Sequence, residues 1–251
     1  NSNMYVRNLL VQRAKVNLKA SKNVTAYLDT ANLNSLDTST VVGLDMNSSA
    51  NAVGRSDTQI NLEAGSSVNA DRTDAGSGAV GLFINYGEAK IDNGAKINVE
   101  KSGLNDANAK AVGVYAVNGA EVVDQASKIT VGERSYGFIL NNTDPNKTNV
   151  YTNTNAGSVS LGNDSVFLYS KGKANITNNR TINSNNSDHL IGFYVKNGGE
   201  LLNNGIIDFS TGKGNIGIYA PAGKATNKGK IFVGSTDDID PATGKAYSDP
   251  T

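Results

Sequence analysis

The feature that most constrains this chain is a repeat of its own sequence. Residues 191–194 read Ile-Gly-Phe-Tyr and are followed, after a polar turn, by Leu-Leu-Asn-Asn-Gly-Ile-Ile at residues 201–207. A shift of 25 positions aligns them, with no gap, with residues 166–169 (Val-Phe-Leu-Tyr) and 176–182. Self-similarity of this length is typical of repeat architectures, in which each unit buries its apolar face against the next unit.

The first repeated segment is a short apolar stretch around a glycine, which only one copy replaces, with Phe167. The seven copies are residues 42–44, 80–83, 112–115, 136–139, 166–169, 191–194 and 216–219. Residues two positions apart in a strand share a face. We therefore expect the apolar residues on either side of the glycine, such as Val112 and Val114, to be core. The glycine is expected on the opposite face, together with the aromatic residue.

The second repeated segment is a corner followed by a strand with alternating apolar residues, such as Ile97 and Val99. One position before each of these strands is rich in amides. It is occupied by Asn93, Gln125, Asn155, Asn178, Asn203 and Asn227, with Ala20 and Ala64 in the earlier copies. Carboxamides stacked about 4.8 Å apart form hydrogen bonds along the stack. The pattern predicts a structural ladder of asparagines at one corner.

The spacing of the copies indicates the fold class. Successive copies are 23 to 32 residues apart, with one larger step between Val24 and Val68. Leucine-rich repeats have a regular leucine spacing and a helical segment, and propeller blades are longer, so neither fits. The sequence predicts an all-β fold, a right-handed parallel β-helix (β-solenoid) of about eight coils with 23–32-residue repeats. Residues 16–233 are assigned to the β-helix, 1–15 to an N-terminal cap or a preceding coil, and 234–251 to a polar tail or the start of a next segment.

The composition gives no indication of a nucleic-acid partner, a metal or a cofactor. The 23 basic residues are balanced by 23 acidic ones, and there is no cysteine. His189 is the only histidine, so no site with two imidazoles and no histidine triad with a second base is expected. The triplet Asp237, Asp238 and Asp240 lacks the continuation of an EF-hand loop, so we expect a solvated loop there.

The carboxylates do not indicate an enzyme. Polysaccharide lyases and hydrolases built on β-helices need charged residues gathered at one coil position over two or three coils. Asp92, Asp124 and Asp208 fall at different phases of the repeat or stand alone. We therefore expect no catalytic residues and a protein that is not an enzyme.

An aromatic stripe is the one feature that suggests a binding surface. It consists of Phe83, Tyr115, Ile139, Tyr169, Tyr194 and Tyr219, one residue from each of six successive copies. If these residues face outward, they form a strip suited to stacking on sugars or docking a partner. The alternative is an ordinary stack of side chains covered by neighbouring loops. The candidate binding residues are Tyr115, Tyr169, Tyr194 and Tyr219.

The wording of the repeats resembles a known family. Segments such as Ala-Thr-Asn-Lys-Gly-Lys-Ile-Phe-Val-Gly at residues 225–234, and the tail at residues 240–250, are similar to passenger domains of large type V autotransporter adhesins, most of all the fusobacterial ones. The resemblance covers about residues 16–249. It implies a stalk segment on the bacterial cell surface, on the extracellular side of the outer membrane, carried by a C-terminal β-barrel that is not present here. The implied partners are a host-cell receptor (protein or glycan) or the surface of a partner bacterium.

Two other readings stay open at this point. A carbohydrate-active lyase or hydrolase uses the same fold, and an activity screen separates it from an adhesin. The head of a trimeric autotransporter also stacks short strands, but its repeats have a shorter period, and a mass measurement in solution separates it.

Overall fold

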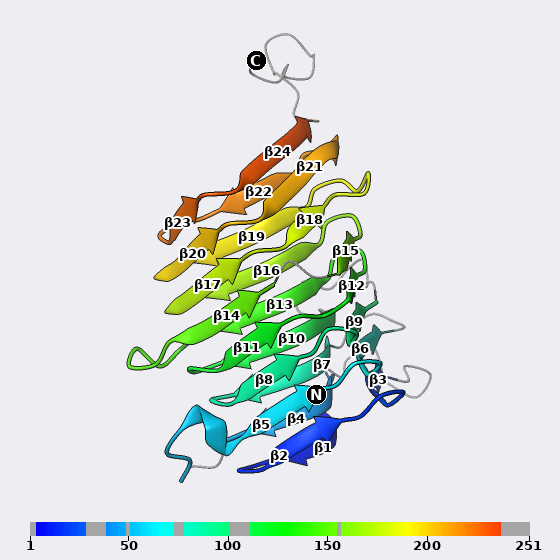
Figure 1. The fold of residues 1–251 in the computed structure, drawn as a ribbon, viewed down its shortest axis with the longest axis vertical. Helices are drawn as coiled ribbons and strands as arrows, with labels where there is room; N and C mark the ends of the chain where they lie inside the picture. Colours follow the sequence, from blue (N-terminus) through cyan, green and yellow to red (C-terminus); the bar gives the residue numbers. More distant parts are fainter. Residues whose placement is uncertain are drawn as a thin grey trace.

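A computed structural model of the chain describes residues 4–28, 39–48, 51–72, 78–100, 111–154 and 157–236, and its strands stack into one elongated solenoid (Figure 1). All paired strands are parallel, and neighbours in a sheet come from successive coils. This confirms the predicted parallel β-helix of about eight coils. Its right-handed sense stays an expectation that rests on the general preference of parallel crossovers.

Each coil contributes one strand to each of three walls. Sheet A contains β1 (Met4–Val11), β4 (Ser39–Asn47), β7 (Gly78–Asn85), β10 (Ala111–Val117), β13 (Tyr136–Asn141), β16 (Val166–Lys171), β19 (Ile191–Lys196) and β22 (Ile216–Tyr219). Sheet B contains β2 (Lys15–Leu18), β5 (Gln59–Leu62), β8 (Glu88–Ile91), β11 (Glu121–Asp124), β14 (Asn149–Asn153), β17 (Ala174–Asn178), β20 (Gly199–Asn203) and β23 (Lys224–Asn227).

The third wall is divided into two sheets. Sheet C contains β3 (Asn23–Leu28), β6 (Ser67–Arg72), β9 (Lys96–Val99), β12 (Lys128–Val131) and β15 (Ser158–Leu161). Sheet D contains β18 (Thr181–Asn183), β21 (Ile206–Lys213) and β24 (Lys230–Ser235). The only helical element in the described ranges is one 3-10 turn, η2 (Arg55–Asp57), and no helix there is long and apolar enough to span a membrane.

The repeat length varies along the stack. Paired residues in sheet A are 25 positions apart from Val166 to Ile191 and from Ile191 to Ile216, but 38 apart from Val42 to Val80. The early coils are thus longer than 23–32 residues, in agreement with the one larger step found in the sequence between Val24 and Val68, which are partners in β3 and β6. Extra length is tolerated in a solenoid because insertions fall between strands and leave the pairing unchanged.

Alternating burial explains why the second and third segments of each coil form strands. In β9, Ile97 and Val99 are buried while Lys96 is exposed. Between sheets A and B the chain reverses in a tight turn, as at Asn118 and Gly119, whose φ angles are 52° and 89°. Two successive positive φ angles characterise a type I′ turn, which Asn-Gly strongly favours.

The glycine of the first segment faces the interior, contrary to the prediction. A Cβ atom on Gly113 would lie 2.7 Å from Ile97 Cγ2 and 2.7 Å from the carbonyl oxygen of Gly137. Phe167, which replaces this glycine in one copy, is fully buried in the main core. The glycine and the apolar residue after it, such as Val114, both point inward, so the alternation shifts by one residue at the glycine.

The apolar residue before the glycine consequently lies on the outer face of sheet A. Val42, Val80 and Val112 form a second apolar cluster, separate from the main core. The prediction is therefore right for the stripe that contains Val114 and wrong for the stripe that contains Val112. The prediction failed because side chains of sheet C pack directly against the glycine backbone of sheet A. At that point, successive residues of the strand do not alternate strictly between the inner and the outer face.

The asparagine ladder is present in the later coils. Asn153 Nδ2 donates to Asn178 Oδ1, Asn178 Nδ2 to Asn203 Oδ1, and Asn203 Nδ2 to Asn227 Oδ1, each at 2.7 Å. The first three side chains are fully buried. The ladder thus satisfies polar groups inside the solenoid along four successive coils.

The prediction of the rungs is right for Asn178, Asn203 and Asn227 and wrong for Asn93 and Gln125. In register, the position before the corner is held by Ile91, Asp124 and Asn153 in the preceding coils. Asn155 lies outside the described residues, as do Asp237, Asp238 and Asp240.

Corner length explains this error. Asn178 and Ile182, the first buried residue after the corner, are four positions apart, whereas Asp124 and Ile129 are five apart and Asn153 and Val159 six apart. The sequence prediction placed each rung four positions before the first buried residue of the next strand. This rule gives the correct residue only where the corner is shortest.

Candidate functional site

Three of the four predicted binding residues form a continuous row on the outer face of sheet A. Tyr169 pairs in register with Tyr194, and Tyr194 with Tyr219. The ring centroids of Tyr169 and Tyr194 are 5.1 Å apart, and those of Tyr194 and Tyr219 are 4.9 Å apart. Tyr169 and Tyr194 are half-exposed and Tyr219 is 45% exposed. These three residues are called the tyrosine column below.

Tyr115 is separated from the tyrosine column. Ile139 lies between Tyr115 and Tyr169 in the register of sheet A. The ring of Tyr115 packs against Phe83, with 5.8 Å between centroids, and its hydroxyl accepts a hydrogen bond of 3.0 Å from Asn141 Nδ2. Tyr115 is therefore part of the second apolar cluster and less available to a ligand than the column.

The hydroxyl groups of Tyr169 and of the neighbouring Tyr136 keep their protons at neutral pH. Burial, followed by the neighbouring Tyr194 and Tyr136, raises the pKa of Tyr169 above its usual value. Burial, followed by Tyr194, also raises the pKa of Tyr136, whose ring centroid lies 6.3 Å from that of Tyr169. These hydroxyls can both donate and accept hydrogen bonds, which suits a polar partner.

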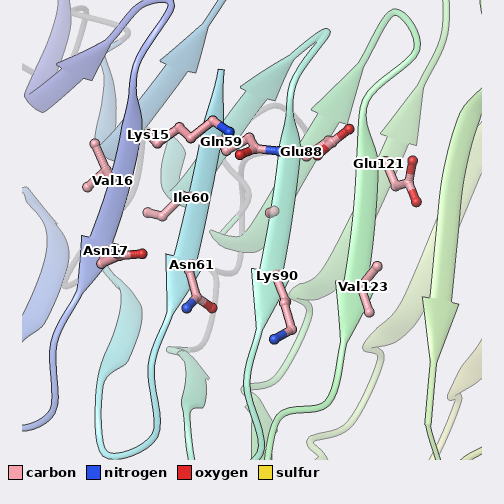
Figure 2. A pocket seen from close by; sticks show the side chains of 11 residues that line it. Lys15, Val16, Asn17, Gln59, Ile60, Asn61, Glu88, Lys90, Glu121 and Val123 are labelled. Atoms are coloured by element: carbon pink, nitrogen blue, oxygen red, sulfur yellow. Dashed lines mark hydrogen bonds between the residues drawn. The ribbon is translucent and has the colours of Figure 1, made fainter. Parts of the chain in front are cut away.

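A second candidate surface is a groove of about 440 Å³ on the outer face of sheet B. Figure 2 shows side chains from β2, β5, β8 and β11 along it, with the amide of Gln59 directed toward Glu88. Gln59 Nε2 donates to Glu88 Oε2 at 2.5 Å, and Arg55 Nη1 lies 3.2 Å from Glu121 Oε2. Lys15 and Lys90 also line the groove, so it carries both signs of charge.

Glu88 and Glu121 correct the statement that no carboxylate position repeats in neighbouring coils. They are partners in register in adjacent strands and both face the groove. The signal was present in the sequence, because each glutamate begins the strand after a glycine turn. The aspartates Asp92, Asp124 and Asp208 lie at other positions of the repeat, and residues 101–110 lengthen the step between the two glutamates, which obscures the pattern.

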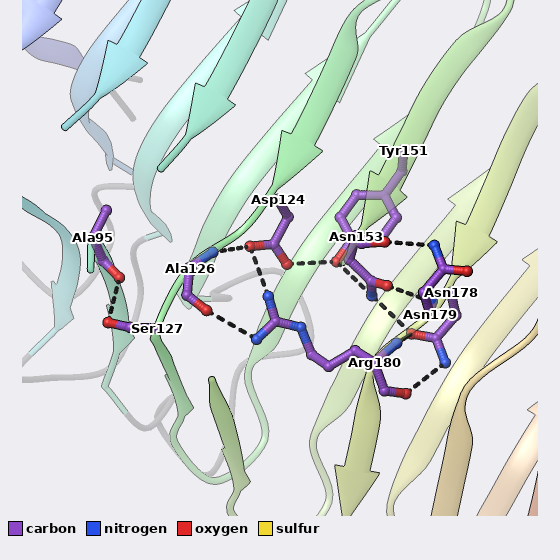
Figure 3. A network of polar contacts seen from close by, with 9 residues as sticks. All are labelled: Ala95, Asp124, Ala126, Ser127, Tyr151, Asn153, Asn178, Asn179 and Arg180. Atoms are coloured by element: carbon purple, nitrogen blue, oxygen red, sulfur yellow. Dashed lines mark hydrogen bonds and ion pairs between the residues drawn. The ribbon is translucent and has the colours of Figure 1, made fainter. Parts of the chain in front are cut away.

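A buried ion pair was also missed (Figure 3). Arg180 Nη2 lies 3.2 Å from Asp124 Oδ1, and neither side chain is exposed. The hydroxyl of Tyr151 donates to Asp124 Oδ2 at 2.8 Å, and Arg180 Nη1 donates to the carbonyl oxygen of Ala126 at 3.0 Å. These groups come from three successive coils, and their position inside the core makes them structural. Arg180 occupies the position that Gly205 and Gly229 hold in the next two coils. An arginine at a glycine position of the repeat is the sequence feature that could have indicated this buried ion pair.

Burial dominates the protonation of this cluster. It raises the pKa of Asp124, and the nearby Arg180 offsets only part of that effect. Burial also raises the pKa of Tyr151 well above its usual value, and the charge of Asp124 adds to the increase. Tyr151 therefore remains the hydrogen-bond donor to Asp124.

Within the described ranges, no three His, Cys, Asp or Glu side chains are arranged to hold a metal ion. His189, the one histidine, has its Nδ1 atom 3.3 Å from Asp164 Oδ1 in the loop region before β16 and β19. Comparisons with protein-family models, with curated proteins and with solved structures find no match to this chain, so its function is argued from the two surfaces themselves.

Proposed function

We propose that this chain is a non-enzymatic segment of a bacterial surface adhesin, of the autotransporter type that its repeats resemble. In this proposal the stacked coils form a stiff stalk on the extracellular side of the outer membrane. The tyrosine column makes the contact with a host-cell receptor or with the surface of a partner bacterium. A C-terminal outer-membrane β-barrel elsewhere in the protein would carry the stalk.

The observation that supports this proposal most is the continuous, partly exposed row of Tyr169, Tyr194 and Tyr219. Tyrosine offers a large apolar ring together with a hydroxyl, and it is enriched at binding interfaces for that reason. The three rings are fixed by the register of β16, β19 and β22, so little side-chain or backbone ordering is needed on binding.

The test is attachment of the purified chain to host cells and to partner bacteria. Replacing Tyr169, Tyr194 and Tyr219 together by alanine should reduce attachment at least about tenfold, since interface tyrosines often contribute 1–2 kcal/mol or more each.

A matched control changes a different wall, sheet B, of the same three coils. Thr177, Leu202 and Thr226 are partners in register and face outward on sheet B, so alanine at all three positions should leave attachment unchanged. Equal attachment by the tyrosine variant and the wild type, with unchanged circular dichroism, removes the column from the proposal.

A carbohydrate-active enzyme is the second candidate, and the observation that favours it is the stacked pair Glu88 and Glu121 in the sheet B groove. Paired carboxylates across a groove are the usual catalytic arrangement in glycoside hydrolysis. A screen on pectin-like and host glycans decides between the two functions. Turnover that is lost in both Glu88→Gln and Glu121→Gln would establish the enzyme, and turnover that neither variant affects would exclude this pair.

A further inference from the structure

Two lysines lie beside the tyrosine column on the same face. Lys171 and Lys196 follow Tyr169 and Tyr194 by two positions in β16 and β19, and they are partners in register. Lys171 is exposed and Lys196 is half-exposed. Neither ammonium forms an ion pair with any residue that the structure describes. A column of positive charge therefore runs parallel to the tyrosine column, one side-chain position away.

No carboxylate opposes this charge on the same face. From β7 to β22, the described outward-facing residues of sheet A include no aspartate or glutamate; the one carboxylate in this register, Asp45 in β4, pairs with Arg7. The acidic residues in the loops before and after β13, β16 and β19 have partners of their own. Glu133 lies 3.5 Å from Arg134, Asp164 lies 3.3 Å from His189, Asp144 lies 4.0 Å from Lys147, and Asp188 accepts from the backbone N–H of Lys213. The face thus has a local excess of positive charge on a chain whose net charge is zero.

The shape of this surface fits a narrow ligand. The three rings advance by steps of 5.1 and 4.9 Å along a row one side chain wide. A stable protein partner usually needs about 800 Å² of surface on each side, whereas an extended oligosaccharide follows a single row. Tyrosine rings pack against the apolar C–H faces of sugars, and their hydroxyls bind sugar hydroxyls.

We propose that the tyrosine column and the two lysines bind an acidic saccharide. The sugar rings lie along the tyrosine column, and a sugar carboxylate pairs with Lys171 or Lys196. This inference rests on the proposed adhesive function and assigns the class of ligand to the same surface. Lysine recognises such a carboxylate through charge-assisted hydrogen bonds, which are stronger than neutral ones.

The experiment measures binding of the 251-residue chain to two acidic probes and their neutral counterparts. The probes are sialyllactose against lactose, and oligogalacturonate against its methyl ester, so that the two common sources of a sugar carboxylate are separated. Binding of one or both acidic members, at least about tenfold tighter than the neutral member and weakened by added salt, supports the inference. Equal binding of acidic and neutral members overturns it.

The variant Lys171→Gln/Lys196→Gln should weaken acidic-sugar binding about tenfold, as expected for the loss of charge-assisted hydrogen bonds. The control is Lys96→Gln/Lys128→Gln, which removes two exposed lysines that are also partners in register, but on sheet C. It should bind as the wild type does. If both double variants lose binding, the attraction is non-specific and the inference is overturned. If neither double variant loses binding, the inference is overturned as well.

A polyglutamate competitor separates a saccharide site from a general anion surface. Displacement of the sugar by polyglutamate at equal charge concentration overturns the assignment to a saccharide. If the chain attaches to cells through the tyrosine column but binds none of the sugars, the inference fails and the proposed function stands. If it attaches to no cells, the proposed function fails first.

Discussion

The buried pair of Asp124 and Arg180 gives the sharpest stability prediction. Arg180→Met keeps a long unbranched side chain but removes the guanidinium, which leaves the carboxyl of Asp124 with Tyr151 and the Ala126 N–H as partners. Removing one member of a fully buried ion pair typically costs 3–5 kcal/mol. The carbonyl oxygen of Ala126 also loses the Arg180 donor, worth about 1 kcal/mol more. Together these contributions predict a loss of about 5 kcal/mol in the free energy of unfolding near neutral pH.

The penalty should depend on pH. The pKa of Asp124 is raised by burial and lowered most by Arg180, so removing Arg180 raises it further. A carboxyl whose pKa is higher in the folded than in the unfolded state binds a proton on folding. Its contribution to stability is complete below the unfolded pKa and is lost as the pH rises through the folded pKa. Arg180→Met should therefore cost less at about pH 5 than at about pH 8.

A double variant separates the charge effect from packing. In Arg180→Met/Asp124→Asn neither charge of the pair remains, and the new carboxamide oxygen can still accept from the Ala126 N–H, so part of the lost stability should return. Urea unfolding, followed by far-ultraviolet circular dichroism and by tyrosine fluorescence since the chain has no tryptophan, compares the wild type with both variants. An unchanged midpoint for Arg180→Met, or a double variant as unstable as the single one, would refute the reasoning.

Two further predictions concern the repeat itself. Gly113→Ala should destabilise the fold by about 1–3 kcal/mol, because the new Cβ would lie 2.7 Å from Ile97 Cγ2. The control is Gly54→Ala, whose Cβ would have its nearest atom at 3.8 Å and which should change stability by less than about 0.5 kcal/mol. Asn203→Ala breaks one buried and one partly buried hydrogen bond of 2.7 Å and should cost about 2–4 kcal/mol. Asn227→Ala, at the exposed end of the ladder, should cost about 1 kcal/mol or less. Thermal unfolding measures both comparisons, and equal shifts within either pair would contradict the packing described above.

The fold was predictable from the sequence because its repeat is visible without a structure. The period identified a parallel β-helix, and the register of residues such as Tyr169 and Tyr194 followed directly from aligning the copies. Alternation alone could not predict which residues of the first strand face the core, since the shift in alternation at Gly113 depends on the close approach of Ile97 from another wall. In the sequence, the indication that this glycine position faces the core is its replacement by the apolar Phe167 in one copy.

The polar interior was harder to foresee. The corner between the ladder and the next strand varies in length from coil to coil. A fixed offset from the strand therefore misses Asp124 and Asn153, which hold the ladder position in their coils. Asp124 and Arg180 lie two coils apart in the stack, and neither belongs to a residue type that repeats at its position, so the periodicity does not predict their contact. The row of tyrosines was predicted, whereas its separation from Tyr115 depends on the single aliphatic residue Ile139.

The most direct test of the adhesive function is whether the isolated chain attaches to cells at all. Labelled chain is titrated onto host cells and onto partner bacteria, with excess unlabelled chain, sugars and free amino acids as competitors. We predict saturable attachment that unlabelled chain displaces. Attachment that is absent, or that rises linearly without saturation on every cell type, would contradict the proposal that this solenoid is an adhesive segment.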